Sequence, residues 1–202
     1  IDLRTRAWYN ENLDSHSYFI PGVLVIVVSI VSLLLTSMAV VREKEIGTME
    51  QIIVTPIRRG EFILGKTIPF IIIGFIDVAI ITLVAAFWFH VPIRGSIPLL
   101  FGATALFLMS SLGFGLLIST VSRTQQQAMM SAFFFIFPAM LLSGFAFPIE
   151  NMPPPVQWLT FLNPLRYYLV IIRGVFLKGV GITILWQQLA ALFMLGTVIL
   201  SF

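Results

Sequence analysis

Long uncharged runs alternate with short polar segments along this chain. Charged side chains are absent from four stretches, which are Ser17 to Val41, Gly95 to Ser122, Thr124 to Ile149 and Gly179 to Phe202. A helix needs about 20 predominantly apolar residues to cross a bilayer, and each stretch is long enough. With a further apolar run after Thr67, the pattern predicts membrane-spanning helices at about 17–41, 67–90, 96–121, 126–147 and 180–202.

The run at 67–90 carries Asp77 close to its midpoint. An aspartate at the centre of a membrane helix costs about 2.5 to 3.5 kcal/mol, whereas each Leu, Ile, Phe or Val returns about 0.3 to 0.6 kcal/mol. The many such residues around Asp77 still allow insertion, and the carboxyl must then face another helix or a wet cavity. Two interpretations stay open: a carboxyl that is protonated or bonded to a hydroxyl of a neighbouring helix, and a group with a role in transport.

Charge gathers between the first two runs, in residues 42–67, which we call the elbow. Ile46, Met49 and Ile53 recur at i, i+3 and i+7, so the first half is predicted to be an amphipathic helix over 42–56. Thr55-Pro56 ends it, because proline lacks the amide proton and pushes its predecessor out of the helical region. Such a helix could lie solvated on the membrane surface or dock a cytoplasmic partner.

The second half of the elbow contains a misleading motif. Residues 60–67, GEFILGKT, fit the phosphate-loop pattern G-x-x-x-x-G-K-[ST]. A phosphate loop follows a buried strand and keeps its backbone amides free, but here two arginines precede the motif and Phe-Ile-Leu fills it. A membrane run follows instead of a nucleotide-binding domain, so we predict no ATP site in this chain.

Two further segments differ from the spanning runs. Residues 1–16 are polar and are predicted to be the end of an aqueous segment. In 156–178, aromatic residues mix with Arg166, Arg173 and Lys178, which is typical of the headgroup level of a membrane. We therefore predict interfacial helices there, broken at Asn163-Pro164.

Composition assigns the class of the protein. Of 202 residues, 58% are hydrophobic and only 10% charged, with mean hydropathy +1.01, whereas soluble domains are about 25% charged. The chain is predicted to be an all-α, polytopic membrane protein. The net charge of +3 is spread over loops, which argues against a nucleic-acid partner. Zero cysteines exclude disulfides and thiolate metal sites. The chain begins with Ile and without a signal-peptide pattern, so we expect a fragment whose start is missing.

Aromatic residues in the run at 126–147 are the remaining candidates for a ligand wall. Phe133, Phe134 and Phe137 lie close together around a helix turn. Contact with lipid or ordinary packing is the simpler interpretation, and lining a substrate pathway is the alternative. Orientation is weakly encoded, because Lys and Arg are equally numerous on the two sides; only their density in the elbow favours a cytoplasmic elbow.

Three segments together carry a family resemblance. They are REKEIGTMEQIIVTPIRRGEFILGK at 42–66, SRTQQQ at 122–127 and LLSGFAFPIENMPPPVQWLTFLNPLRYYLVIIRGVFLKG at 141–179. In this order, over essentially the whole chain, they resemble the permease subunits of type-two ABC exporters, in the branch linked to drug efflux. The resemblance implies a six-helix subunit of which helices two to six are present here. It places the elbow inside the cell and residues 148–179 outside, and it makes residues 1–16 the end of an extracytoplasmic segment.

The resemblance also implies roles for residues and partners. It makes the helix at 42–56 a coupling helix that docks on an ATPase subunit. The matching positions are Arg42, Glu43, Glu45, Gly47, Thr48, Glu50, Thr55 and Pro56. It implies a second permease copy in a homodimer or heterodimer, a periplasmic adaptor protein, a bacterial inner-membrane location, and ATP and magnesium held by the partner rather than by this chain.

Three functions are considered for this sequence. The first is a non-catalytic permease that exports hydrophobic or amphipathic, drug-like compounds by alternating access, driven by a partner ATPase. The second is a proton-coupled secondary transporter that uses Asp77, although such folds usually show internal repeats, and none is visible here. The third, an intramembrane enzyme, lacks the cluster of His, Asp or Glu that its chemistry would need.

Overall fold

The computed structural model describes residues 15–48, 54, 59–91 and 93–201, and in that part of the chain the secondary structure is entirely helical. The α-helices are α1 (Ser15–Ser37), α2 (Val41–Ile46), α4 (Arg59–Phe87), α5 (Ile97–Val121), α6 (Gln125–Leu141), α7 (Pro154–Thr160), α8 (Pro164–Arg173) and α9 (Ile182–Ser201). A 3₁₀ turn, η1 (Ile149–Asn151), precedes α7, and a π-helical turn, η2 (Gly174–Lys178), follows α8. The all-α class predicted from the sequence is confirmed.

Among the described residues, four stretches are long and apolar enough to cross a membrane: Phe19–Ile46, Gly60–Phe87, Ile97–Val121 and Ile182–Ser201. The first joins α1 to α2 through a turn at residues 38–40. They match four of the five predicted spans, and the chain is a multi-pass membrane protein. The remaining prediction, 126–147, corresponds to α6, which has 17 residues and falls short of that length.

The helix limits differ from the predicted ones where turn chemistry intervenes. The helix predicted over 126–147 ends at Leu141, because Ser143 Oγ donates to the Met140 carbonyl at 2.6 Å and Gly144 then takes a left-handed conformation with φ 83°. This conformation favours glycine and turns the chain. In the other direction, α4 begins at Arg59, eight residues before the predicted start at Thr67.

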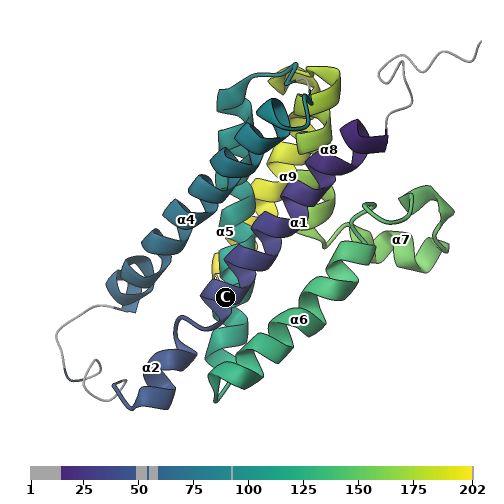
Figure 1. The fold of residues 1–202 in the computed structure, drawn as a ribbon. Helices are drawn as coiled ribbons and strands as arrows, with labels where there is room; N and C mark the ends of the chain where they lie inside the picture. The colour runs from purple at the N-terminus through teal and green to yellow at the C-terminus, as the bar shows by residue number, and fades with distance from the viewer. Residues whose placement is uncertain (1–14, 49–53, 55–58, 92, 202) are drawn as a thin grey trace, which may run out of the picture.

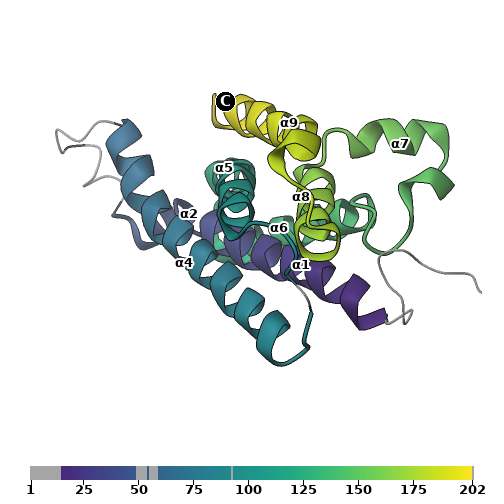
Figure 2. The same cartoon turned by 90° about the horizontal axis from the view of Figure 1, so that it is seen from above.

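Helix α5 forms the centre of the bundle, with α1 and α4 on one side and α9 on the other (Figure 2). It buries Leu100, Phe107, Leu108 and Leu112. A Cβ atom at Gly115 would lie 2.6 Å from Cβ of Thr36 on α1, which is closer than two such atoms can approach. Small residues therefore let the backbones of α1 and α5 pack closely.

The segment from 154 to 178 divides into an outer and an inner part. The predicted break at Asn163-Pro164 is confirmed: Pro164 begins α8, and the Asn163 side chain accepts a hydrogen bond from the Leu165 amide at 3.1 Å. Helix α7 exposes Trp158 by 76%. Helix α8 packs between α1, α5 and α9 and buries Tyr168 completely. The interfacial prediction for 156–178 did not include this inner position of α8, and the membrane depth of both helices stays a prediction.

Candidate functional site

The described part of the elbow lies where four helices end. Helix α2 adjoins the α5–α6 turn, and the chain enters α4 at the same end of the bundle (Figure 1). Val41 packs inward and is fully buried, while Arg42 and Ile46 are exposed, Ile46 by 61%. The elbow therefore has one face fixed to the bundle and one face open.

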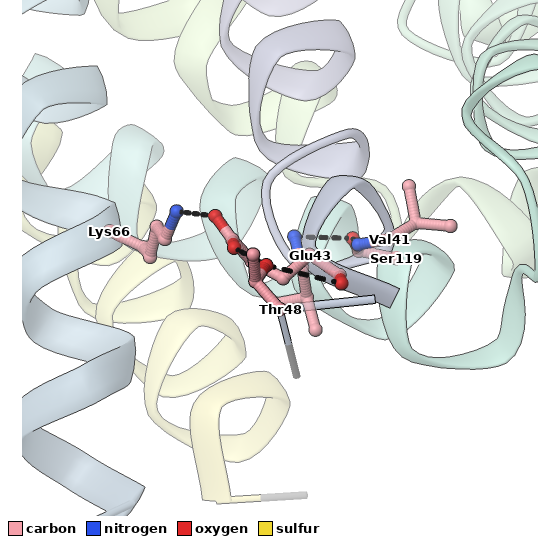
Figure 3. A network of polar contacts seen from close by, with 6 residues as sticks. Val41, Glu43, Thr48, Lys66 and Ser119 are labelled. Carbon is pink, nitrogen blue, oxygen red and sulfur yellow. Dashed lines mark hydrogen bonds and ion pairs between the residues drawn. The ribbon is translucent and has the colours of Figure 1, made fainter. Parts of the chain in front are cut away.

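The start of α2 is held by a side chain from another helix. The backbone amides of Val40 and Val41 both donate to Oγ of Ser119 on α5, each at 2.9 Å (Figure 3). The first amides of a helix have no partner inside it, and a valine at the N-cap cannot supply one. Ser119 thus caps α2 from outside.

An ion pair ties α2 to α4. The Glu43 carboxylate contacts Lys66 Nζ through one oxygen and accepts a hydrogen bond from the Thr48 hydroxyl through the other (Figure 3). Both partners are partly buried, with 17% of the Glu43 side chain and 34% of the Lys66 side chain exposed. Glu43 therefore points into the chain.

The next two charged residues reach the α5–α6 turn. Lys44 Nζ donates to the Thr120 carbonyl at 2.5 Å, and Glu45 Oε2 accepts from the Gln125 amide at 3.0 Å. A cation at the end of α5 and an anion at the start of α6 both suit the helix dipoles. Thr124 completes the turn as N-cap of α6, accepting from the Gln127 amide at 3.2 Å.

Of the eight predicted docking residues, five are described. Arg42, Glu43 and Glu45 lie on α2, followed by Gly47 and Thr48. The helix predicted over 42–56 is interrupted after Ile46, because Gly47 adopts φ 85° and its amide bonds to the Glu43 carbonyl at 3.1 Å. Val54 is helical again. Glu50, Thr55 and Pro56 lie outside the described residues.

The phosphate-loop pattern is helical. Residues 60–67 lie within α4, where backbone amides bond along the helix instead of facing a phosphate. The Thr67 hydroxyl donates to the Ile63 carbonyl at 2.7 Å, and Lys66 binds Glu43. This helical geometry supports the prediction that residues 60–67 do not form a nucleotide site. The described residues also hold no group of three or more His, Cys, Asp or Glu side chains arranged for a metal.

The predicted pathway residues do not converge within this chain. Asp77 lies on α4 and the phenylalanines lie on α6, and these helices run on either side of α1 (Figure 1). Asp77 is half-buried, and its Oδ2 lacks a hydrogen-bond partner among the described residues. Phe133, Phe134 and Phe137 point outward and are 49%, 83% and 63% exposed. Any joint wall would need a second polypeptide or lipid to complete it.

A half-open pocket of about 210 Å³ lies beside Lys66, the partner of Glu43. It is lined by Leu35, Met38, Ala39, Arg42, Lys66, Phe70 and Gln125, from α1, the turn at 38–40, α2, α4 and α6. Empty space beside an ion pair leaves the surrounding helix ends room to shift, in contrast to a close-packed interior.

Comparison with known proteins gives a consistent result. The family model described as ABC-2 type transporter matches residues 5–177. The chain is 36% identical over 188 residues to "Probable multidrug ABC transporter permease YbhR" of Escherichia coli K12, covering 93% of this chain and 51% of that protein. It is 41% identical over 183 residues to "Probable multidrug ABC transporter permease YbhS" of the same organism, covering 89% and 48%.

A third relative is more distant. It is "Inner membrane transport permease YhhJ" of Escherichia coli K12, 30% identical over 200 residues, which cover 97% of this chain and 53% of that protein. The chain thus spans about half the length of the curated relatives that it matches.

Proposed function

Because this chain belongs to the ABC-2 type transporter family of membrane permeases, we propose that it is the membrane-spanning part of an exporter driven by a separate ATPase. The cargo is a hydrophobic or amphipathic, drug-like compound, which leaves the cytoplasm by alternating access. The names of two relatives as multidrug permeases support this cargo class. ATP and magnesium are held by the ATPase and not by this chain.

Five spans are proposed, with α6 as the one that falls below the usual length. Its 17 residues rise about 25 Å at 1.5 Å per residue, and a short span is accommodated by local thinning of the bilayer. The exposed Phe133, Phe134 and Phe137 support either lipid contact or a pathway that a second permease copy completes. The assembly we propose is a dimer in a bacterial inner membrane, with the elbow inside the cell and a periplasmic adaptor protein outside.

The observation that carries the proposal is the bonding of α2 to three other helices. Glu43 bonds to α4, Lys44 to α5 and Glu45 to α6. A partner that pushes on a helix fixed in this way moves several spans together, as rigid-body switching requires. The elbow is therefore the coupling element of the transporter.

Within the elbow, the proposed docking residues divide into two groups. The carboxylates of Glu43 and Glu45 and the hydroxyl of Thr48 are used inside the chain, so these residues brace α2. The exposed Arg42 and Gly47, together with the exposed Ile46, form the face that an ATPase groove contacts. Glu50, Thr55 and Pro56 lie outside the described residues and are docking residues in the same proposal.

A second candidate function depends on Asp77. Its Oδ2 has no hydrogen-bond partner among the described residues, and an ionisable residue inside a membrane-spanning helix is a candidate for a proton or ion pathway. Proton-coupled transport would use this group. The family membership and the bonding of α2 favour the ATP-driven reading, and the two differ in their response to ATP depletion.

The test is co-purification of the full-length permease with its ATPase from detergent extracts. Arg42→Glu should reduce the bound ATPase by about tenfold or more, since a reversed charge in an interface both removes an attraction and adds a repulsion. Arg94→Glu is the matched control, because Arg94 is also exposed but lies in the connection between α4 and α5, at the opposite end of the bundle.

Equal ATPase binding in wild type, Arg42→Glu and a variant with residues 43–56 scrambled would refute docking at the elbow. Loss of binding in Arg94→Glu instead would reverse the proposed orientation.

A further inference from the structure

The N-terminal end of α2 has no capping group in its own sequence. Its N-cap is Val40, with φ −91° and ψ −38°, and valine has no side-chain acceptor. The Ala39 amide bonds to the Thr36 carbonyl at 3.0 Å and the Arg42 amide to the Met38 carbonyl at 3.1 Å. The two amides between them need an acceptor from elsewhere, because buried amides are almost always paired.

Ser119 supplies that acceptor through one atom. Its Oγ receives both the Val40 and the Val41 amide at 2.9 Å, and a hydroxyl oxygen has two lone pairs to do so. Ser119 and Val41 are both fully buried and Val40 is 6% exposed, so water cannot take over. The direction of α2 is therefore tied to one side chain near the end of α5.

Two more bonds join α2 to the same region. Lys44 reaches the Thr120 carbonyl and Glu45 the Gln125 amide. These residues belong to the last turn of α5 and the first of α6, whereas covalent connection links the elbow only to α1 and α4. The noncovalent contacts thus add two helices to those the elbow already joins.

We propose that Ser119 is the positioning residue that fixes α2 on the end of α5, so that movement of the elbow reaches α5 and α6 as well as α1 and α4. The part of this inference that concerns transport rests on the proposed function. The structural part, in which Ser119 fixes the orientation of α2, does not depend on an ATPase partner.

The structural part is tested by the mobility of α2 in the full-length permease. A nitroxide label at Ile46→Cys sits on the exposed end of α2, and residues 1–202 contain no other cysteine. Ser119→Ala should raise the mobility of this label clearly, because it leaves two buried amides without an acceptor. Ser110→Ala is the matched control: Ser110 is also fully buried on α5, but its hydroxyl bonds to the Leu192 carbonyl on α9 at 3.4 Å.

The transport part is tested with the assembled transporter. Ser119→Ala should lower the amount of cargo exported per ATP hydrolysed by about fivefold or more, the scale expected when buried hydrogen bonds are lost, while ATPase binding and hydrolysis persist. Ser119→Cys keeps the side-chain shape with a somewhat larger and much weaker acceptor, so it should give the same direction of change. Ser110→Ala should leave the ratio of export to hydrolysis unchanged.

The outcomes are separable. Unchanged label mobility in Ser119→Ala overturns the inference whether or not an ATPase binds. Raised mobility with an unchanged ratio overturns the role of Ser119 in coupling. If both Ser119 variants fail to assemble while Ser110→Ala assembles, Ser119 serves folding and the inference is also lost. A wild-type permease that binds no ATPase would refute the proposed function. The label experiment would still test whether Ser119 fixes the orientation of α2.

Discussion

The elbow and the α8 region are held to the same bundle by different forces. At the elbow, hydroxyls, amides and charges fix a helix of six residues whose outer face is exposed. Around α8, Leu169, Ile171, Ile172 and Phe176 are buried in one apolar cluster. Directional bonds can be exchanged one at a time, and two of those at the elbow, Lys44 to Thr120 and Glu45 to Gln125, are open to water. A close-packed core instead resists gradual deformation. The difference supports the coupling role that we propose for the elbow, whereas the buried cluster around α8 stabilises the bundle.

The largest expected effect comes from the packed region. Tyr168 stacks on Phe107 with ring centroids 4.3 Å apart and planes 5° apart, and its hydroxyl bonds to that of Thr104 at 2.9 Å. Tyr168→Ala should lower the free energy of unfolding by about 3 to 5 kcal/mol, the cost of truncating a buried aromatic. Denaturant unfolding of the purified full-length permease in mild detergent measures this.

Tyr168→Phe separates the ring from the hydroxyl. Thr104 keeps its bond to the Leu100 carbonyl at 2.8 Å, so this variant should lose only about 1 kcal/mol. If Tyr168→Phe lowered the free energy of unfolding as much as Tyr168→Ala, polar bonding rather than packing would hold α8. The contrast between the elbow and the α8 region would then be wrong.

The second prediction concerns the ion pair of the elbow. Glu43→Lys places two cations opposite each other, and it should reduce ATP-dependent export by about tenfold while changing the free energy of unfolding by less than about 1 kcal/mol, because a partly exposed pair contributes little to stability. Export from inverted membrane vesicles and denaturant unfolding measure the two quantities.

The charge-swapped variant Glu43→Lys with Lys66→Glu sharpens this result. It restores an opposite-charge pair between α2 and α4 and should recover most of the export, since the Glu43 carboxylate is used inside the chain. Export that stays lost in the swapped variant would show that Glu43 itself touches the ATPase, and its assignment as a brace would be wrong.

Features that depend on local sequence, such as long apolar helices, could be predicted, whereas helix ends and contacts between distant residues could not be predicted as well. Long apolar runs predicted α1, α4, α5 and α9, because helix length and hydropathy depend on local composition. The proline after Asn163 marked the start of α8 for an equally local reason. Helix ends were less accurate, as at Ile46 and Leu141, because a glycine in the left-handed conformation can end a helix before the apolar pattern does.

The contacts that form the elbow site could not be predicted from the sequence. Lys66 lies 23 positions from Glu43, and Ser119 lies 79 positions from Val40. Nothing in the local pattern distinguishes Ser119 from the other small residues of its run, whose register against α1 is set by packing. Only the valine at the N-cap of α2 hints that an outside acceptor is needed, and that hint requires the start of the helix to be known.

The smallest expected effect comes from Asp77, which belongs to neither region. Its carboxyl lies at the edge of the packed face of α4, near the buried Val78, and makes no hydrogen bond through Oδ2 within the described part of the chain. Asp77→Asn keeps the shape and removes only the ability to ionise, so ATP-driven export should change by less than about threefold, within the range of ordinary substitutions away from critical contacts. Export assayed in vesicles with ATP, and again with an imposed proton gradient but no ATP, distinguishes the mechanisms. Export that needs only the gradient and is abolished by Asp77→Asn would make this carboxyl the coupling site, and the elbow would then have to be a structural loop rather than the point where a motor acts.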